Sequence, residues 1–367
     1  MMNRMIAANL VHRPIRSLIS IVAIALEVTL ILMIVGLSLG ILDDTKQRQA
    51  GIGADVIVMP PGSSFFVGLT GAPMSVKVGD IVAKLPHVVT VAPVVTNISS
   101  NGALEVISGI DLKSYEALRR FRYLSGGPFQ GPDDALVDDL FAHSKHMNVG
   151  DSLEILNHSF RLAGIVEHGQ GARKFIPIPT MQDLTGAKDK ASVFYLKLDS
   201  PSSADTVVDE IKHVPGMERY QAVSMAYYLS MMTPSNTPGL RSFITVVIAV
   251  SLIIGFLVIF QAMYTAVMER TREIGILKSL GASKLYIVNV ILRETALLAL
   301  AGIVVGVIFS VTARAALRQK LPLLQMEFSA EWMVRATAIA IVGALLGALY
   351  PAYKAAQKDP IDALAYE

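Results

Sequence analysis

Four long apolar segments constrain this chain more than any other feature of its sequence. Each reaches the roughly 20 residues that an α-helix needs to cross a bilayer. The segments are Ser17 to Leu42, Leu240 to Met268, Leu285 to Thr312 and Trp332 to Tyr353. We therefore expect four transmembrane helices. The first is too long to be the apolar core of a cleaved signal peptide, so it should be a retained anchor.

The composition agrees with a membrane protein and excludes several other classes. Of the 367 residues, 53% are hydrophobic and 17% are charged, whereas soluble proteins usually contain about 25% charged residues. The formal net charge of +2 gives no reason to expect nucleic acid as a partner. Because the chain has no cysteine, disulfides, thiolate metal sites and cysteine nucleophiles are excluded.

The basic residues between the spans predict the orientation. The N-terminal stretch, the connection from Glu269 to Lys284 and the tail from Lys354 are all basic, and the positive-inside rule assigns such flanks to the cytoplasm. Both termini should then be cytoplasmic. The expected organisation is residues 1–42 with the first span, an extracytoplasmic domain over 43–239, and residues 240–367 with spans two to four, the cytoplasmic segment 269–283 and the tail 354–367.

The segment from Asp43 to Gly239 has the pattern of a soluble α+β domain, with short β-rich runs bounded by turn residues. A plausible turn is Asn157-His158, before an alternating run. Expected strands are Asp55–Met59, Val88–Thr96, Leu104–Ile110, Ser152–Leu156, Phe160–Val166, Phe175–Ile178 and Val193–Leu198. Expected helices are Lys77–Lys84, Leu112–Phe121 and Ala204–His213.

A search for catalytic, cofactor or metal motifs finds none that is complete. His143 and His146 are spaced i, i+3 and could hold a metal, although solvated surface histidines are commoner. The pairs Gly51/Gly53 and Gly169/Gly171 each begin a G-x-G without a third glycine. The dipeptide Gly-Lys does not occur, so a Walker A loop for ATP is excluded. We expect no catalytic, cofactor or metal residues in this chain.

The connection after the second span predicts a short amphipathic helix. Ile274, Leu277 and Leu280 form one apolar stripe, and Gly281 suits a left-handed C-terminal cap. A helix this short is not stable alone, so its apolar side needs a partner surface. The alternative is a basic flank that rests on lipid headgroups.

The C-terminal segment predicts an ordered tail. The fourth span continues as a basic helix, stops at Asp359 and restarts with Asp359 as N-cap, Pro360 at the first helical position and Asp362 at the third. The alternative is an ordinary frayed terminus.

Charged residues and glycine motifs within the spans are further candidates. Glu27, Arg293 and Glu294 are functional candidates because charge inside a bilayer is costly, although Glu294 is close enough to the cytoplasmic helix to snorkel or pair with a basic group there. Three G-x-x-x-G motifs allow close helix packing within or between protomers. They begin at Gly36, Gly302 and Gly343.

At two segments the residues match a known family. ERTREIGILKSLGAS from Glu269 to Ser283 and PAYKAAQKDPIDAL from Pro351 to Leu364 closely resemble the signature segments of the FtsX-like, MacB-type permeases of ABC transporters. The entry NLVHRPIRSL from Asn9 to Leu18 and the runs Gly150–Ile155 and Phe160–Val166 are also similar to that family. The order of one span, a large outer domain and three spans is the family's order.

The resemblance implies a set of partners and site residues. It implies a bacterial inner-membrane permease that pairs with a second protomer, as a homodimer, and with a separate ATPase dimer that binds ATP and Mg. A periplasmic adaptor and an outer-membrane channel are further possible partners. The implied ATPase-coupling residues are Glu269, Arg270, Arg272, Glu273, Ile274, Gly275, Leu277, Lys278, Leu280 and Gly281. The implied C-terminal motif comprises Pro351, Lys354, Asp359, Pro360 and Leu364.

The function that the resemblance implies is mechanotransmission. ATP-driven motion at the cytoplasmic side would move the extracytoplasmic domain and export a hydrophobic or amphiphilic cargo without passing it through the spans. The alternative is a signalling scaffold, since relatives of this family regulate cell-wall hydrolases and transport nothing. A membrane enzyme is a third reading, and the sequence offers no nucleophile or metal constellation for it.

Overall fold

The computed structural model describes residues 14–63, 73–99, 105–237 and 239–359. It contains two compact units. The helical unit combines the chain up to Gly40 with Gly239–Gln319 and the part from Met326 onward. The sheet unit combines Ile41–Pro238 with Lys320–Gln325. The sequence analysis assigned 320–325 to the membrane domain and did not foresee that this connection belongs with the sheet.

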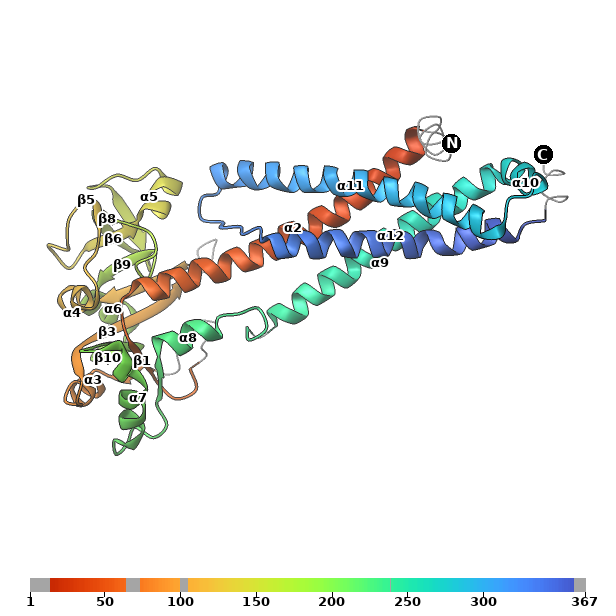
Figure 1. Cartoon of the computed structure of the whole chain (residues 1–367). Coiled ribbons are helices and arrows are strands. Elements are labelled where there is room, and N and C mark those ends of the chain that lie inside the picture. Colours follow the sequence, from red (N-terminus) through yellow and green to blue (C-terminus); the bar gives the residue numbers. More distant parts are fainter. Residues whose placement is uncertain (1–13, 64–72, 100–104, 238, 360–367) are drawn as a thin grey trace. The chain divides into compact units, whose positions relative to one another are not determined.

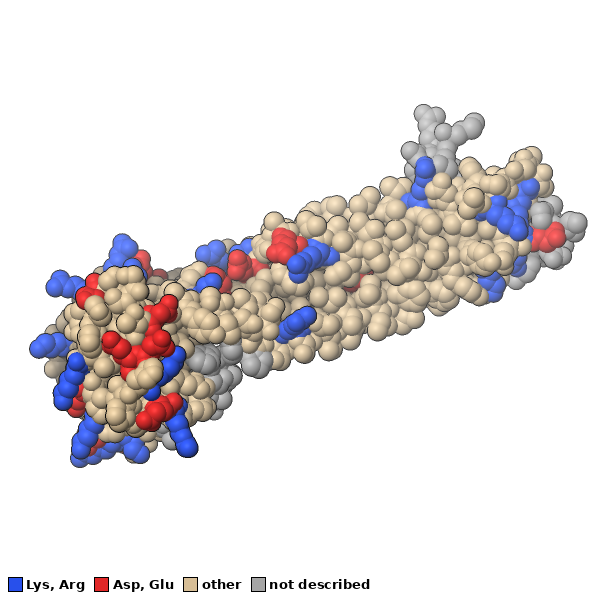
Figure 2. Space-filling view, turned by 60° about the horizontal axis from the view of Figure 1, so that its bottom comes forward, with Lys and Arg blue, Asp and Glu red and all other residues tan. Residues whose placement is uncertain are grey.

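The helical unit is built from four long helices, as the apolar segments predicted. They are α2 (Pro14–Gly51), α9 (Leu240–Glu269), α11 (Lys284–Lys320) and α12 (Ala330–Gln357) (Figure 1). All four are long and apolar enough to cross a membrane. Figure 2 shows a long stretch of this unit with almost no charged residue on the visible face. All four helices are longer than the predicted spans, and the largest extensions are those of α2 beyond Leu42 and α11 beyond Thr312.

Two of the glycine motifs bring helix backbones together inside the chain. A methyl group added at Gly306 of α11 would lie 2.7 Å from the carbonyl oxygen of Ala25 in α2, and one at Gly347 of α12 would lie 2.8 Å from that of Phe256 in α9. Such distances leave no room for a side chain. The α2–α11 and α9–α12 pairs are therefore close-packed through glycine, as membrane helices commonly are.

The centre of the sheet unit is a ten-stranded mixed sheet in the order β12-β1-β11-β3-β4-β9-β6-β8-β5, with β7 paired to β8; β2 and β10 form a separate pair. The strands of the first half are β1 (Val56–Met59), β2 (Met74–Ser75), β3 (Val88–Ser99), β4 (Glu105–Ile110), β5 (Tyr123–Gly126) and β6 (Asp134–Asp138). Those of the second half are β7 (Ser152–Ile155), β8 (His158–Val166), β9 (Lys174–Pro177), β10 (Lys190–Ala191), β11 (Val193–Leu198) and β12 (Gln221–Ser224).

Short helices cover this sheet and complete its apolar clusters. They are α3 (Lys77–Val82), α4 (Leu112–Leu118), α5 (Asp139–Lys145), α6 (Ile178–Thr185), α7 (Ala204–His213) and α8 (Met225–Met231). One buried cluster joins α7 to β1 and β11, through residues such as Val207, Val56 and Leu196. Another joins α5 to β6 and β8, through Phe141, Val137 and Phe160. The layered α+β architecture expected for the segment after the first span is confirmed.

The predicted strands and helices of this unit are present, with three differences. The turn before β8 lies one residue earlier than predicted, because Leu156 and Asn157 carry positive φ angles while His158 already pairs with Ile155. Ile178 begins α6 instead of ending a strand. Leu104 lies outside the described residues. Among the described strands and α-helices of this unit, β2, β5, β6, β10, β12, α5, α6 and α8 were not predicted.

Candidate functional site

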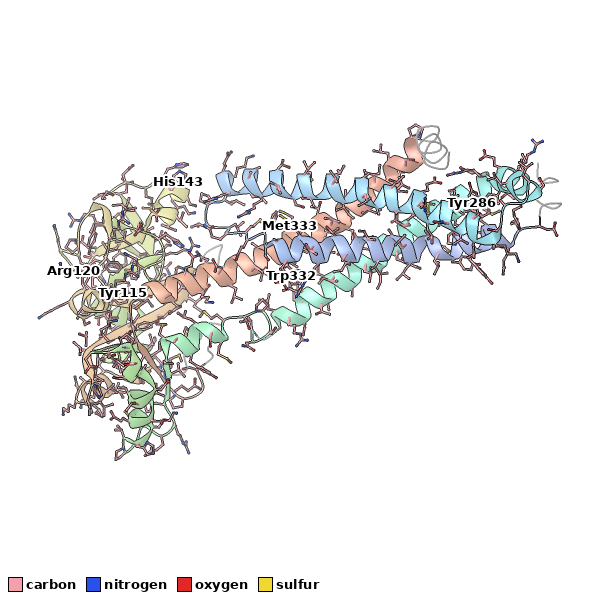
Figure 3. The ribbon with its side chains drawn as sticks, viewed as in Figure 1. Tyr115, Arg120, His143, Tyr286, Trp332 and Met333 are labelled. Carbon is pink, nitrogen blue, oxygen red and sulfur yellow. The ribbon has the colours of Figure 1, made fainter. Side chains whose placement is uncertain are left out.

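The candidate site is the corner formed by α10 (Thr271–Ser279) and the first turn of α11, which we call the α10 corner. It falls in the segment that the sequence analysis singled out. Figure 3 shows the labelled Tyr286 at the end of the helical bundle that carries α10, and Figure 2 shows Lys and Arg gathered toward that end.

A buried ion pair fixes the start of the α10 corner. The guanidinium of Arg270 donates hydrogen bonds of 2.6 and 3.1 Å to the two carboxylate oxygens of Glu294. Glu294 is 1% exposed and Arg270 is 14% exposed at the side chain. The predicted pairing of Glu294 with a basic group is therefore confirmed. The guanidinium of Arg270, a residue expected to contact the ATPase, is bound inside the chain, and its contact with a partner stays a prediction.

A second cation fixes the end of α10. The ammonium of Lys278 donates to the carbonyl oxygen of Ala356 at 3.0 Å and to that of Lys358. These carbonyls belong to the C-terminal end of α12, where backbone acceptors have no partner within the helix. Lys278 therefore ties α10 to α12, and its expected contact with the ATPase stays a prediction.

The predicted apolar stripe is divided between the two sides of α10. Ile274 and Leu277 pack against the buried core of the helical unit, and Gly275 is buried there as well. Leu280 is 79% exposed. This corrects the expectation that all three stripe residues enter a partner, because the short helix already covers half of its apolar side with its own bundle.

The outward side of the α10 corner nevertheless combines apolar and charged side chains. Leu280 and Leu285 are 79% and 81% exposed. Ile276 and Tyr286 are also exposed, and the sequence analysis missed them together with Leu285 because it followed only one stripe of the helix. The charged residues on this side are Glu269, Arg272, Glu273 and Lys284. Such a surface suits a protein groove with an apolar floor and a polar rim.

The bend of the corner is set by Gly281, as predicted. Gly281 has a φ of +94°. Its N–H donates to the carbonyl of Lys278, and the next N–H, of Ala282, donates to that of Leu277, both at 3.0 Å. This pair of bonds is a Schellman cap, which requires a left-handed residue and favours glycine. The Ser283 hydroxyl then accepts from the N–H of Tyr286 at 3.2 Å and caps the start of α11.

The remaining intramembrane charges have different surroundings. Glu27 is 3% exposed, and its Oε1 has no hydrogen-bond partner. It fills space left by Gly255 of α9, where an added methyl group would lie 2.0 Å from Oε2. Arg293 is exposed and donates to the Asn289 side chain at 3.1 Å. Of Glu27, Arg293 and Glu294, Glu27 is therefore the residue that has a buried oxygen without a hydrogen bond.

The C-terminal motif is described only in part. Pro351 is buried within α12, and the ammonium of Lys354 lies 5.4 Å from the centre of the Tyr264 ring in α9. α12 ends at Gln357, before Asp359. Pro360, Asp362 and Leu364 lie outside the described residues, so the predicted restart of the helix stays a prediction.

The described part of the chain contains no group of three or more metal-ligating side chains. The rings of His143 and His146 are 6.4 Å apart, and no third such ligand joins them among the residues searched.

Comparison with known families agrees with a membrane permease. The family described as MacB-like periplasmic core domain matches residues 17–214, and the family described as FtsX-like permease C-terminal matches residues 245–360. The first match alone covers more than half of the chain. The chain belongs to the FtsX/MacB-type permeases of ABC transporters.

Individual relatives are similar over nearly the whole chain. The macrolide export ATP-binding/permease protein MacB of Shewanella sp. is 25% identical over 97% of this chain, and that of Escherichia coli K12 is 25% identical over 99%. This chain spans 59% and 60% of the two relatives. The solved periplasmic region of MacB from Actinobacillus actinomycetemcomitans aligns with 52% of this chain and 97% of its own length, at 14% identity and a TM-score of 0.39.

Proposed function

We propose that this chain is the permease subunit through which an ABC ATPase dimer on a partner chain drives motion of the sheet unit. ATP and Mg bind to that partner, and this chain is a non-catalytic subunit. The observation that carries the proposal is the exposed apolar and charged side of the α10 corner, held on a helix that is fixed from behind. The family membership supports the same reading.

The attachments of α10 suit the transfer of force from a partner. The Arg270–Glu294 pair joins the α9–α10 junction to α11, and Lys278 joins α10 to the end of α12. Since Ile274 and Leu277 pack into the same core, a push on the outward side is passed to three of the four long helices. If flexible chain alone attached the corner, a push on it would move the corner without moving the long helices.

We propose that the cargo is hydrophobic or amphiphilic and is moved at the extracytoplasmic side. The names of the relatives describe macrolide export, and macrolides are large, mainly apolar molecules. The close-packed helix pairs of the bundle support mechanotransmission, because they leave little room for a polar path between them. The arrangement in the cell would be an inner-membrane homodimer with both termini in the cytoplasm and the sheet unit outside.

The docking assignment is tested by changing the exposed side of the α10 corner. Leu280→Glu places a charge where we expect an apolar contact, so copurification of an ABC ATPase with the full chain should be lost. Leu124→Glu, at another exposed leucine on β5 of the sheet unit, is the matched control and should keep the ATPase. Retention of full ATPase binding by Leu280→Glu would contradict the proposal.

A further inference from the structure

A cluster of buried charges lies at the last turns of α2. The ring of His168, in the loop between β8 and β9, lies between two carboxylates. Its Nδ1 is 2.7 Å from Oδ2 of Asp138, at the end of β6, and its Nε2 is 2.8 Å from Oδ1 of Asp44 in α2. Both carboxylates are buried. The contact with Asp138 is a hydrogen bond, and the contact with Asp44 is an ion pair. A neutral imidazole has one N–H and no charge, so two carboxylates at its two nitrogens favour the protonated ring.

Arginines and a third aspartate complete the cluster. Arg173 lies 3.1 Å from Asp44 and 3.8 Å from Asp138, and Arg48 of α2 lies 3.1 Å from Asp44. Asp139 accepts the backbone N–H of His168 at 2.7 Å. With His168 protonated, three cations face three carboxylates, so the cluster is balanced in charge.

The cluster joins segments that are distant in sequence. Asp44 and Arg48 belong to α2, which is one unbroken helix from Pro14 to Gly51. Arg173 also donates to the carbonyl oxygen of Leu323 at 3.4 Å, and Leu323 lies in the connection between α11 and α12. Two of the segments by which the chain passes between its units therefore meet at one arginine of the sheet unit.

The packing around the cluster is close enough to hold α2 in place. A methyl group added at Gly51, the last residue of α2, would lie 1.6 Å from the carbonyl oxygen of Gly169, next to His168. Gln49 accepts the Tyr195 hydroxyl of β11 at 3.2 Å. The two incomplete G-x-G motifs of the sequence are thus the places where α2 and the β8–β9 loop touch.

We propose that the His168 cluster is the joint through which α2 moves the sheet unit, with His168 as its positioning residue. The inference rests on the proposed function. Loss of the proton from His168 would remove the cation between two buried carboxylates and leave Asp44 with Arg48 and Arg173 alone, and a shortage of cations around buried carboxylates is costly. The attachment of α2 to the sheet should therefore be tighter while the imidazolium bridges them.

The charge state of His168 makes the joint testable by pH. Burial opposes the charged ring, but the contacts with Asp138 and Asp44 outweigh it and raise the pKa of His168 from 6.5 to about 9. The stabilisation is therefore complete below pH 6.5 and is lost as the pH rises through about 9.

The first test measures the joint in the full chain alone. Because the chain has no cysteine, spin labels can be placed through Lys46→Cys on α2 and Lys145→Cys on α5. We expect a narrow distance distribution at pH 7 that broadens with a midpoint near the pKa of about 9. The distance distribution of the His168→Asn variant should be broad at every pH. His87→Asn, at an exposed histidine paired with Asp199 at 2.9 Å, is the matched control and should follow the wild type.

Two results would overturn the joint. One is a narrow, pH-independent distribution in His168→Asn. The other is loss of hydrogen-exchange protection in β1 and β12 of that variant, since these strands lie at the far end of the sheet order from β8. Loss of protection in these distant strands would mean that His168 stabilises the whole sheet unit and has no specific role in attaching α2.

The second test separates this inference from the proposed function. Dyes on Ser242→Cys of α9 and Glu218→Cys of the sheet unit report the distance between the units in complex with the ATPase. An ATP-dependent change in the wild type that His168→Asn loses supports the joint. If the variant retains the change, the joint is wrong and the proposed function stands; if the wild type shows no change, the proposed function itself fails.

Discussion

At the scale of single residues, the contact between Arg270 and Glu294 decides how the α10 corner is held. A glutamate that is 1% exposed needs a cation, because a buried charge without a partner is far more costly than the pair itself is stabilising. The sequence could show that Glu294 lies near a basic segment. It could not show which of Arg270, Arg272 and Lys278 turns inward, since that depends on the rotation of α10 about its axis.

Removing the cation of this pair should destabilise the protein. Arg270→Met removes the cation that lies 2.6 Å from the buried carboxylate of Glu294, so we expect a loss of about 3 to 5 kcal/mol in the free energy of unfolding. Arg272→Met, at the exposed neighbour, should change stability by less than about 0.5 kcal/mol. Denaturant unfolding in detergent measures both. Equal stability of the two variants would refute a structural role for Arg270.

Glycine contacts inside the bundle give a second prediction at this scale. Gly347→Ala places a methyl group 2.8 Å from the carbonyl oxygen of Phe256, so α9 and α12 must separate or shift, at a cost of about 1 to 3 kcal/mol. Gly131→Ala has open space around it and serves as the control. The midpoint temperature of thermal unfolding should be clearly lower for Gly347→Ala than for the control.

At the scale of helices and strands, the sequence predicted those features that depend on neighbouring residues along the chain. Span lengths follow from apolar runs, and the Gly281 cap follows from its position after the last helical turn. Strand β6 was missed because Asp134 and Asp138 bracket a short apolar run. Both carboxylates are buried, because nearby backbone N–H groups and the distant side chains of Arg161 and His168 together satisfy them. The His168 cluster was invisible for the same reason, since Arg173 and Asp44 are 129 positions apart.

The Gly281 cap can be tested without altering any packing contact. Gly281 has φ of +94° and no heavy atom within 4 Å of an added Cβ, so a substitution there acts through the backbone. Gly281→Val should cost about 1 to 3 kcal/mol and weaken ATPase binding. Gly281→Asn should cost less, because asparagine tolerates the left-handed region. Equal ATPase binding by the two variants would contradict the role of the bend.

At the scale of the whole molecule, the division into a helical unit and a sheet unit was predicted from hydropathy alone. The attachment of 320–325 to the sheet unit was not, because a short connection between two spans has the same sequence pattern whether or not it packs on a distant domain. Leu323 belongs to the apolar cluster of β6, β8 and α5, and that contact exists only in the folded chain.

The proposed orientation gives a direct prediction at this scale. A fluorescent reporter that folds only in the cytoplasm should be active when fused after Glu367, and alkaline phosphatase should be active when inserted after Gly131 of the sheet unit. Both outcomes follow from the basic flanks at 269–284 and after Lys354. Phosphatase activity at the C-terminal fusion would contradict the orientation.

The central claim is that ATP turnover by a partner moves the sheet unit through this chain. The distance between dyes on Ser242→Cys and Glu218→Cys, followed in single complexes with the ATPase in lipid nanodiscs, tests it most directly. The account predicts that ATP shifts the distance distribution and that Leu280→Glu abolishes the shift. A distribution that stays the same with and without ATP, in a complex that hydrolyses it, would contradict the account.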